Sequence, residues 1–153
     1  MSTILTKAKA RKTAGDKLVE TCVHGSAKAH PTPTKLIASI QSGLPIAELD
    51  ALQTLLEVPM ETLATKLGIS KATLHRRKAE GRLDPAESDR VVRYARLMGQ
   101  AVKVFGAEAA AREWLNTPQF GLGGEVPLDF AETEIGAREV ENLLGRIEYG
   151  VYS

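Results

Sequence analysis

The stretch Asp84-Pro85-Ala86-Glu87 constrains the fold more than any other, because it fixes the start of one long helix. Aspartate can cap a helix, proline suits the first helical position, and a glutamate three residues after the cap completes a capping box. Apolar residues follow at helical spacing on one stripe: Val91, Tyr94, Ala95, Met98, Ala101, Val102 and Phe105. The pattern predicts a long amphipathic helix whose stripe lies either in the core or in a dimer seam.

Two shorter helices are predicted before this long one. Their apolar residues recur at helical spacing, with Leu36, Ile37 and Ile40 in the first and Leu49, Leu52 and Leu56 in the second. The first helix stops near Gly43, and Pro45 suits the first turn of the second.

Two more helices are predicted after the long one, separated by a loop. One helix follows Gly106 and ends near Asn116, and the stretch 117–132 is rich in Gly and Pro. The last helix starts near Thr133. Its apolar residues fall at i, i+3, i+4 and i+7, namely Val140, Leu143, Leu144 and Ile147, and Gly150 suits its C-cap. Since no segment shows the alternation of a strand, we expect an all-α fold.

Residues 1–31 are predicted to form a flexible basic arm, because they are rich in Lys, Ala, Ser and Thr and show no helical or strand period. The arm either touches a phosphate backbone without sequence preference or is simply disordered. Cys22 and His24 lie in it without further ligands nearby, and a metal site needs three or four, so we expect no metal. Cys22 is the only cysteine, which fits a reducing cytoplasm.

Charge is distributed unevenly along the chain, although the net charge is only +1. Residues 61–103 carry ten basic and five acidic side chains, whereas residues 104–153 carry three basic and nine acidic ones. The contrast indicates two surfaces for two partners, unless the charges simply coat solvated faces. No apolar run approaches the roughly 18 residues of a membrane span, and no signal peptide is apparent, so we expect a cytoplasmic protein without membrane contact.

Residues 60–81, METLATKLGISKATLHRRKAEG, carry the pattern of a helix-turn-helix. The motif needs a small residue where its two helices cross closely, which is Ala64, and a glycine in the turn, which is Gly68. Apolar residues that pack the helices together flank these positions: Leu63, Leu67, Ile69 and Leu74. Ser70 can cap the second helix.

In such a motif the second helix enters the major groove of DNA with its N-terminal residues against base edges. The candidates for base contacts are Ser70, Lys71, Thr73, His75 and Arg76. Arg77, Lys78 and Arg82 are better placed to meet phosphates. Arg77 is atypical, since the usual motif has an aliphatic core residue there. Either the motif is slightly rotated, or Arg77 lays its stem along the core and keeps its head in solvent.

Two stretches of the chain resemble the Xre/MbcA/ParS-like antitoxins of RES–Xre toxin–antitoxin pairs. The first is LGISKATLHRRKAEGRLDPAESDRVVRYARL, residues 67–97, and the second is WLNTPQFGLGGEVPLDFAETEIGAREVENLLGRIEYGVYS, residues 114–153. Matches to the family's toxin-binding domain are Trp114-Leu115, Pro118, Gly123-Gly124, Pro127, the 133–136 turn and residues 144–150. The resemblance spans residues 33–153, and the Arg76-Arg77 pair fits the family pattern.

The resemblance implies a chain of three parts: the arm at 1–31, a helix-turn-helix DNA-binding and dimerisation domain at 32–105, and a small, mostly helical toxin-binding domain at 106–153. It implies a protein that is not an enzyme and needs no cofactor. Such proteins neutralise a RES-domain toxin that consumes cellular NAD, and they bind operator DNA to repress their own operon. A homodimer is expected from the family and, independently, from the two-fold geometry of paired half-sites.

The C-terminal segment is the expected contact with the toxin, through Arg146, Glu148, Tyr149, Gly150, Val151, Tyr152 and Ser153. The last helix docks by its exposed face in this interpretation, and residues 150–153 reach into the toxin's substrate cleft. Tyr149 and Tyr152 are suitable anchors, because aromatic residues dominate interface hot spots. The alternative is that Val151 and Tyr152 fold back onto the chain's own core.

Two other classes of function compete with this hypothesis. One is a stand-alone helix-turn-helix transcriptional regulator, which lacks a RES-domain gene beside its own. The other is an enzyme, but two of the three histidines lie in the arm and His75 lies on the recognition helix, so no Ser/His/Asp or Cys/His set is plausible. Gly123-Gly124 is expected to form a turn rather than a phosphate loop, because no strand precedes it and no Lys-Ser/Thr follows.

Overall fold

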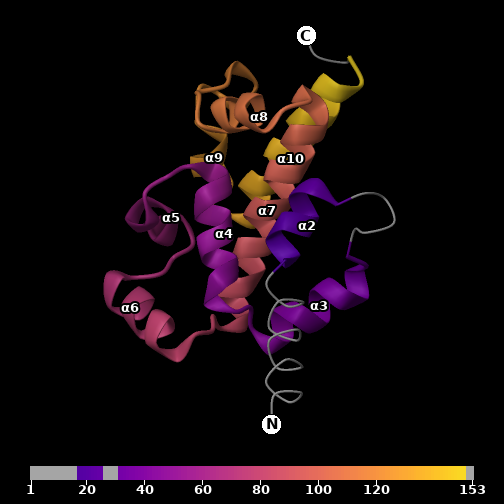
Figure 1. Cartoon of the computed structure of the whole chain (residues 1–153). Coiled ribbons are helices and arrows are strands. Elements are labelled where there is room, and N and C mark those ends of the chain that lie inside the picture. The colour runs from indigo at the N-terminus through magenta and orange to yellow at the C-terminus, as the bar shows by residue number, and fades with distance from the viewer. Residues whose placement is uncertain (1–16, 26–30, 151–153) are drawn as a thin grey trace.

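The structure is a computed structural model that describes residues 17–25 and 31–150 (Figure 1). Every regular element within these ranges is helical: α2 (Leu18–His24), α3 (Pro33–Ser42), α4 (Ile46–Leu56), α5 (Met60–Lys66), α6 (Lys71–Glu80), α7 (Pro85–Phe105), α8 (Glu108–Leu115), the 3-10 helix η1 (Phe120–Leu122), α9 (Pro127–Phe130) and α10 (Glu134–Glu148). The predicted all-α fold is confirmed. None of the described helices is both long and apolar enough to cross a membrane.

Helix α7 is the axis of the fold, and α2, α3, α4, α8 and α10 all pack against it (Figure 1). Its predicted capping box is present: Glu87 N donates to Asp84 Oδ1 at 2.7 Å, and Asp84 N donates to Glu87 Oε1 at 2.9 Å. The stripe forms core, because Val91, Tyr94, Ala95, Met98 and Ala101 are buried while Val102 and Phe105 are partly buried.

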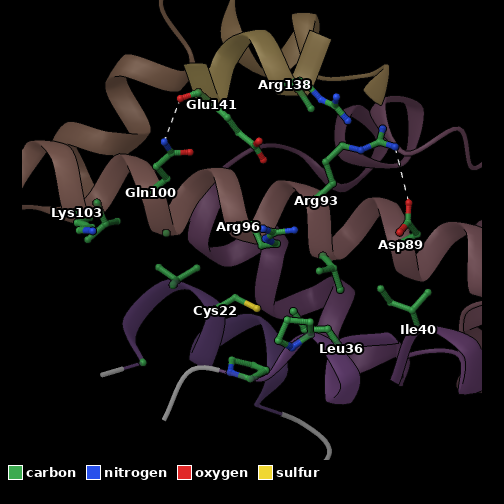
Figure 2. Close-up of a pocket in the computed structure, with 18 of the residues that line it drawn as sticks. Cys22, Leu36, Ile40, Asp89, Arg93, Arg96, Gln100, Lys103, Arg138 and Glu141 are labelled. Atoms are coloured by element: carbon green, nitrogen blue, oxygen red, sulfur yellow. Dashed lines mark hydrogen bonds and ion pairs between the residues drawn. The ribbon is translucent and has the colours of Figure 1, made fainter. Parts of the chain in front are cut away.

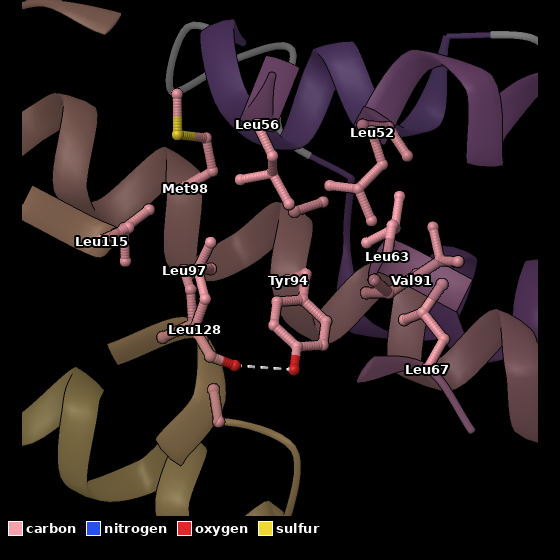
Figure 3. Packing of buried hydrophobic residues seen from close by; sticks show 14 of the residues in the cluster. Leu52, Leu56, Leu63, Leu67, Val91, Tyr94, Leu97, Met98, Leu115 and Leu128 are labelled. Atoms are coloured by element: carbon pink, nitrogen blue, oxygen red, sulfur yellow. Dashed lines mark hydrogen bonds between the residues drawn. The ribbon is translucent and has the colours of Figure 1, made fainter. Parts of the chain in front are cut away.

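Leucines from four neighbouring helices surround α7 (Figure 3). They include Leu52, Leu56, Leu63, Leu115 and Leu128, all fully buried. Each such side chain contributes about 1.5–3 kcal/mol when it leaves water. Tyr94 crosses this cluster, and its hydroxyl donates to the Leu128 carbonyl at 2.9 Å, which ties α9 to the centre of α7. One continuous core therefore joins the two halves of the chain.

The prediction of a flexible arm is wrong for Leu18–His24, which form helix α2 against α7. Val19, Cys22 and Val23 are buried there. Helix α2 also contacts α4, where the buried Glu48 carboxylate accepts the N–H groups of Val19 at 2.6 Å and Leu18 at 3.1 Å. Residues 1–16 and 26–30 lie outside the described residues, so the rest of the arm stays a prediction.

The loop predicted at 117–132 contains two short helices, η1 and α9. Pro127 opens α9 at its first turn, as proline does at helix starts. The last helix begins where expected, since Thr133 Oγ1 accepts the Gly136 N–H at 3.0 Å. Val140, Leu143 and Leu144 are buried beneath it, so the predicted apolar face of α10 is confirmed.

Candidate functional site

Helices α5 and α6 form the predicted helix-turn-helix. Gly68 adopts a φ of 71°, a left-handed turn conformation that glycine adopts without steric cost. Ala64 is buried at the crossing, and its carbonyl accepts the Ile69 N–H at 2.8 Å. Ser70 Oγ accepts the Thr73 N–H at 3.2 Å and so caps α6. The remaining predicted packing residues are also buried, namely Leu63, Leu67, Ile69 and Leu74.

Helix α6 presents most of the predicted base-contacting residues to solvent. Ser70, Lys71, His75, Arg76 and Lys78 are exposed, and Leu74 is the only buried residue of the helix. Thr73 is half-buried, with its hydroxyl accepting from Ser70 Oγ at 2.9 Å. The structure therefore places a cluster of positive side chains along an accessible helix, which is the arrangement that a nucleic-acid contact requires.

Arg77 is engaged within the protein rather than extended toward solvent. Its guanidinium lies 2.7 Å from Glu87, 3.2 Å from Asp84 and 3.2 Å from Glu80, and only 14% of the side chain is exposed. The hydrogen bond to Glu87 is the main cause of a raised pKa for Arg77. Of the two alternatives, the stem does lie in the protein, but the head pairs with carboxylates that join α6 to α7. The phosphate contact expected of Arg77 stays a prediction.

Arg82 is exposed, yet its guanidinium is also engaged. Its Nη1 donates to the Gly43 carbonyl and lies 3.5 Å from the Ser42 carbonyl, at the C-terminal end of α3. A cation is favourable there, because the last carbonyls of a helix carry partial negative charge. Arg82 thus acts as a C-terminal cap for α3, while its expected phosphate contact stays a prediction.

The outward face of α10 carries several of the predicted toxin-binding residues. Arg146 and Tyr149 are exposed, and Gly150 ends the helix with a φ of 70°. Glu148 instead faces α7, with Oε1 3.6 Å from Lys103 Nζ. Tyr149 is 78% exposed, so it does not complete the core. Val151, Tyr152 and Ser153 lie outside the described residues, and the choice between docking and folding back stays open for them.

Ion pairs and a hydrogen bond connect α5 and α7 to α9 and the residues that follow it. Lys66 at the end of α5 pairs with Asp129 and lies 3.9 Å from Glu132, although its own side chain is only 10% exposed. Arg93 of α7 donates to the Glu132 carbonyl at 3.3 Å. The two predicted domains are therefore in direct contact.

A wide groove of about 1340 Å³ lies between α3 and α10, with α7 as its floor (Figure 2). Its floor and walls carry both signs of charge. Within α7, Arg93 lies 3.8 Å from Asp89, and Gln100 of α7 donates to the Glu141 carbonyl of α10 at 3.1 Å. Leu36 and Ile40 line the opposite wall. Cys22 lies at the groove, and burial raises the pKa of its thiol.

The fold and these surfaces define a helix-turn-helix protein with a second helical domain packed against it. Two family models match the same two parts. One is described as an antitoxin Xre-like helix-turn-helix domain and matches residues 35–96. The other is described as the antitoxin Xre/MbcA/ParS C-terminal toxin-binding domain and matches residues 100–150.

Similar proteins carry antitoxin names. A protein of Yersinia enterocolitica named Antitoxin Xre is 38% identical over 122 residues, covering 78% of this chain and 82% of that protein. An Antitoxin Xre of Photorhabdus laumondii is 35% identical over 120 residues, covering 77% and 81%. A Sphingobium protein named Prs ADP-ribosylating antitoxin is 26% identical over 132 residues, covering 80% and 83%. The chain belongs to the Xre antitoxin family and has both its helix-turn-helix and its toxin-binding domain.

Sequence reasoning missed two residues of the second domain. Phe120 and Ile135 are 91% and 79% exposed, and neither was among the expected toxin contacts. Their apolar character was visible in the sequence, but nothing there indicated that they point outward.

Proposed function

We propose that this protein is the antitoxin of a type II toxin–antitoxin pair, that it neutralises a RES-domain toxin which consumes NAD, and that it represses its own operon. The observation that carries the proposal is the match of residues 100–150 to a toxin-binding domain, over a helix whose outward face the core does not use. The word "ADP-ribosylating" in the name of the Sphingobium relative fits a toxin of the NAD-using kind.

Residues 150–153 are the proposed inhibitory element. They follow α10 directly in the sequence. The test is co-expression of a chain truncated after Tyr149 with the RES-type toxin encoded beside it. If cellular NAD collapses although the truncated chain still folds and still binds the toxin, the last four residues inhibit. If NAD stays protected, inhibition comes from docking of α10.

Operator binding is proposed for α6, through Ser70, Lys71, Thr73, His75 and Arg76 on the bases and Lys78 on phosphates. All of these side chains except the half-buried Thr73 are exposed, which supports operator binding by α6. Replacing Arg76 by alanine should reduce discrimination between operator and random DNA by about 1–3 kcal/mol if Arg76 contacts a base. An equal loss on random DNA assigns Arg76 to a phosphate instead. Affinity should also fall steeply with added salt, because phosphate contacts release counterions.

A homodimer is proposed because helix-turn-helix proteins read two half-sites with two copies of the recognition helix. Sedimentation of the purified full-length chain tests this directly, and a monomer at micromolar concentration contradicts it. The protein is proposed to act in the cytoplasm, without catalysis or a cofactor of its own. A stand-alone regulator is the competing function, and the absence of a RES-domain gene beside this one favours it.

A further inference from the structure

Three of the large apolar side chains in the C-terminal half point into solvent. Among the described residues, the exposed large hydrophobic side chains are Phe120, Ile135, Tyr149 and, on the α3 wall of the groove, Ile37. Single exposed apolar residues are ordinary on a protein surface, whereas several gathered on one face mark an interaction site. The question is whether the three C-terminal residues share a face.

Ile135 and Tyr149 lie on the same stripe of α10. They are fourteen residues apart, so at 100° per residue they differ by only about 40° around the helix and by about 21 Å along it. Arg138, Asn142 and Arg146 are exposed between them. The buried residues Val140, Leu143 and Leu144 occupy the opposite side. The stripe is thus apolar at both ends and polar in the middle.

Phe120 lies in η1, which packs against α10. The backbone of η1 packs on the flank of α10, since a Cβ at Gly121 would lie 2.8 Å from Leu143 Cδ1. Leu122 points inward and is buried, while Phe120 points outward and is 91% exposed. Both residues belong to one 3-10 turn, so burying Leu122 fixes where Phe120 projects.

Hydrogen bonds hold this turn in place. The side-chain amide of Gln119 donates to the Trp114 carbonyl at 3.1 Å and to the Thr117 carbonyl at 3.0 Å, and its backbone N–H donates to the Glu125 carbonyl at 3.0 Å. An aromatic side chain on a fixed turn loses little conformational freedom when it is covered, which favours binding. The Phe120 side chain is therefore preorganised for binding to a partner.

We propose that Phe120, Ile135 and Tyr149 together form the docking face for the toxin, with Phe120 and Tyr149 as aromatic anchors. This deepens the proposed function and rests on it. All three residues fall within the match to the toxin-binding domain. A face about 21 Å long is compatible with the roughly 800 Å² that each partner contributes to a standard interface. Arg138 and Arg146 supply polar contacts between the anchors.

The test compares matched exposed-to-polar substitutions in the full-length chain. Phe120→Ser and Ile135→Ser remove two parts of the face, and Ile37→Ser removes an exposed apolar side chain from α3. Since all three side chains are exposed, the thermal midpoints should stay close to that of the unmodified chain. Affinity for the purified RES-type toxin is measured by calorimetry, with the molar mass of each free variant checked by sedimentation.

Phe120→Ser should weaken toxin binding at least tenfold, as loss of an interface hot spot does, and Ile135→Ser should weaken it several-fold. Ile37→Ser should leave it unchanged within about twofold. If the unmodified chain binds the toxin and Phe120→Ser binds equally well, the docking face is wrong while the proposed function stands. If Phe120→Ser changes the oligomeric state and not toxin affinity, the face belongs to a second copy of the chain. If the unmodified chain binds no toxin, the proposed function itself fails.

Discussion

Replacing Glu48 by alanine should release α2 from the core. The fully buried Glu48 carboxylate accepts the N–H of Val19 at 2.6 Å and that of Leu18 at 3.1 Å. A hydrogen bond to a charged group contributes about 1.5–3 kcal/mol, and the bond to the part-buried Leu18 contributes less than the one to Val19. The free energy that holds α2 should therefore fall by about 2–4 kcal/mol, which is a large fraction of the 5–15 kcal/mol typical of a whole domain.

The single cysteine reports this release. Cys22 is buried on α2, and burial raises the pKa of its thiol, so a thiol reagent should react slowly with the intact protein. When reaction requires opening of α2, a loss of 2–4 kcal/mol makes labelling roughly 30- to 900-fold faster. Glu48→Gln keeps one acceptor oxygen and should give a smaller increase.

Glu20→Ala is the matched control, because Glu20 is an exposed acid on the same helix. It should change neither the labelling rate of Cys22 nor the urea midpoint measurably. If Glu48→Ala and Glu20→Ala label Cys22 at the same rate as the unmodified chain, Glu48 does not hold α2, and the account of how this segment is anchored is refuted.

Three further substitutions test the packing around α7 and the stability of α10. Gly99→Ala should destabilise the protein by about 1–3 kcal/mol, because a Cβ at Gly99 collides with the backbone carbonyl of Cys22. Gly145→Ala should stabilise α10 by about 0.5–1 kcal/mol, because a Cβ at Gly145 meets nothing within 4 Å. Urea unfolding measures both changes. Tyr94→Phe should cost about 0.5–1.5 kcal/mol at pH 8 by removing the hydrogen bond to Leu128. Burial raises the pKa of Tyr94 above its ordinary value of 10.0, so the unfolded chain loses this proton first and the free energy of unfolding falls as the pH rises past 10. The phenylalanine variant should lack this part of the alkaline loss of stability. If the free energy of unfolding falls equally steeply with pH in both proteins, the raised pKa of Tyr94 is contradicted.

Local signals in the sequence predicted the helix boundaries well. Asp84 with Glu87 and Ser70 cap the helices that they were expected to cap, and Thr133 caps the helix that was expected to start near it. A cap depends on residues three positions apart, so a sequence contains all of the information that it needs. The helix-turn-helix was predictable for the same reason, since its crossing residue and turn glycine lie in one continuous stretch.

Features that depend on distant residues were not predictable in this way. Helix α2 is short, and its first two N–H groups, those of Leu18 and Val19, donate to Glu48, which is 29 residues from Val19 in sequence. No pattern inside residues 18–24 reveals that partner. Arg77 is different, because three acids follow it at Glu80, Asp84 and Glu87, within reach of one or two helical turns. The sequence therefore contained enough information to predict these ion pairs, although only DNA contact and core packing were predicted for Arg77.

The direction of a side chain on an irregular turn is the third kind of information that was missing. Phe120 and Leu122 are both apolar and only two residues apart, yet one is exposed and the other is buried. The sequence contains no period over three residues that separates them. Their directions depend on contacts with residues distant in sequence, such as the close approach of Gly121 to Leu143.

The most direct test of the central claim is the rate of NAD consumption by the purified RES-type toxin as the full-length chain is added. An antitoxin that binds and blocks the toxin predicts that the rate falls in proportion to the added chain and stops at a fixed molar ratio. NAD consumption that continues unchanged with the chain in excess would contradict the claim that this protein neutralises the toxin.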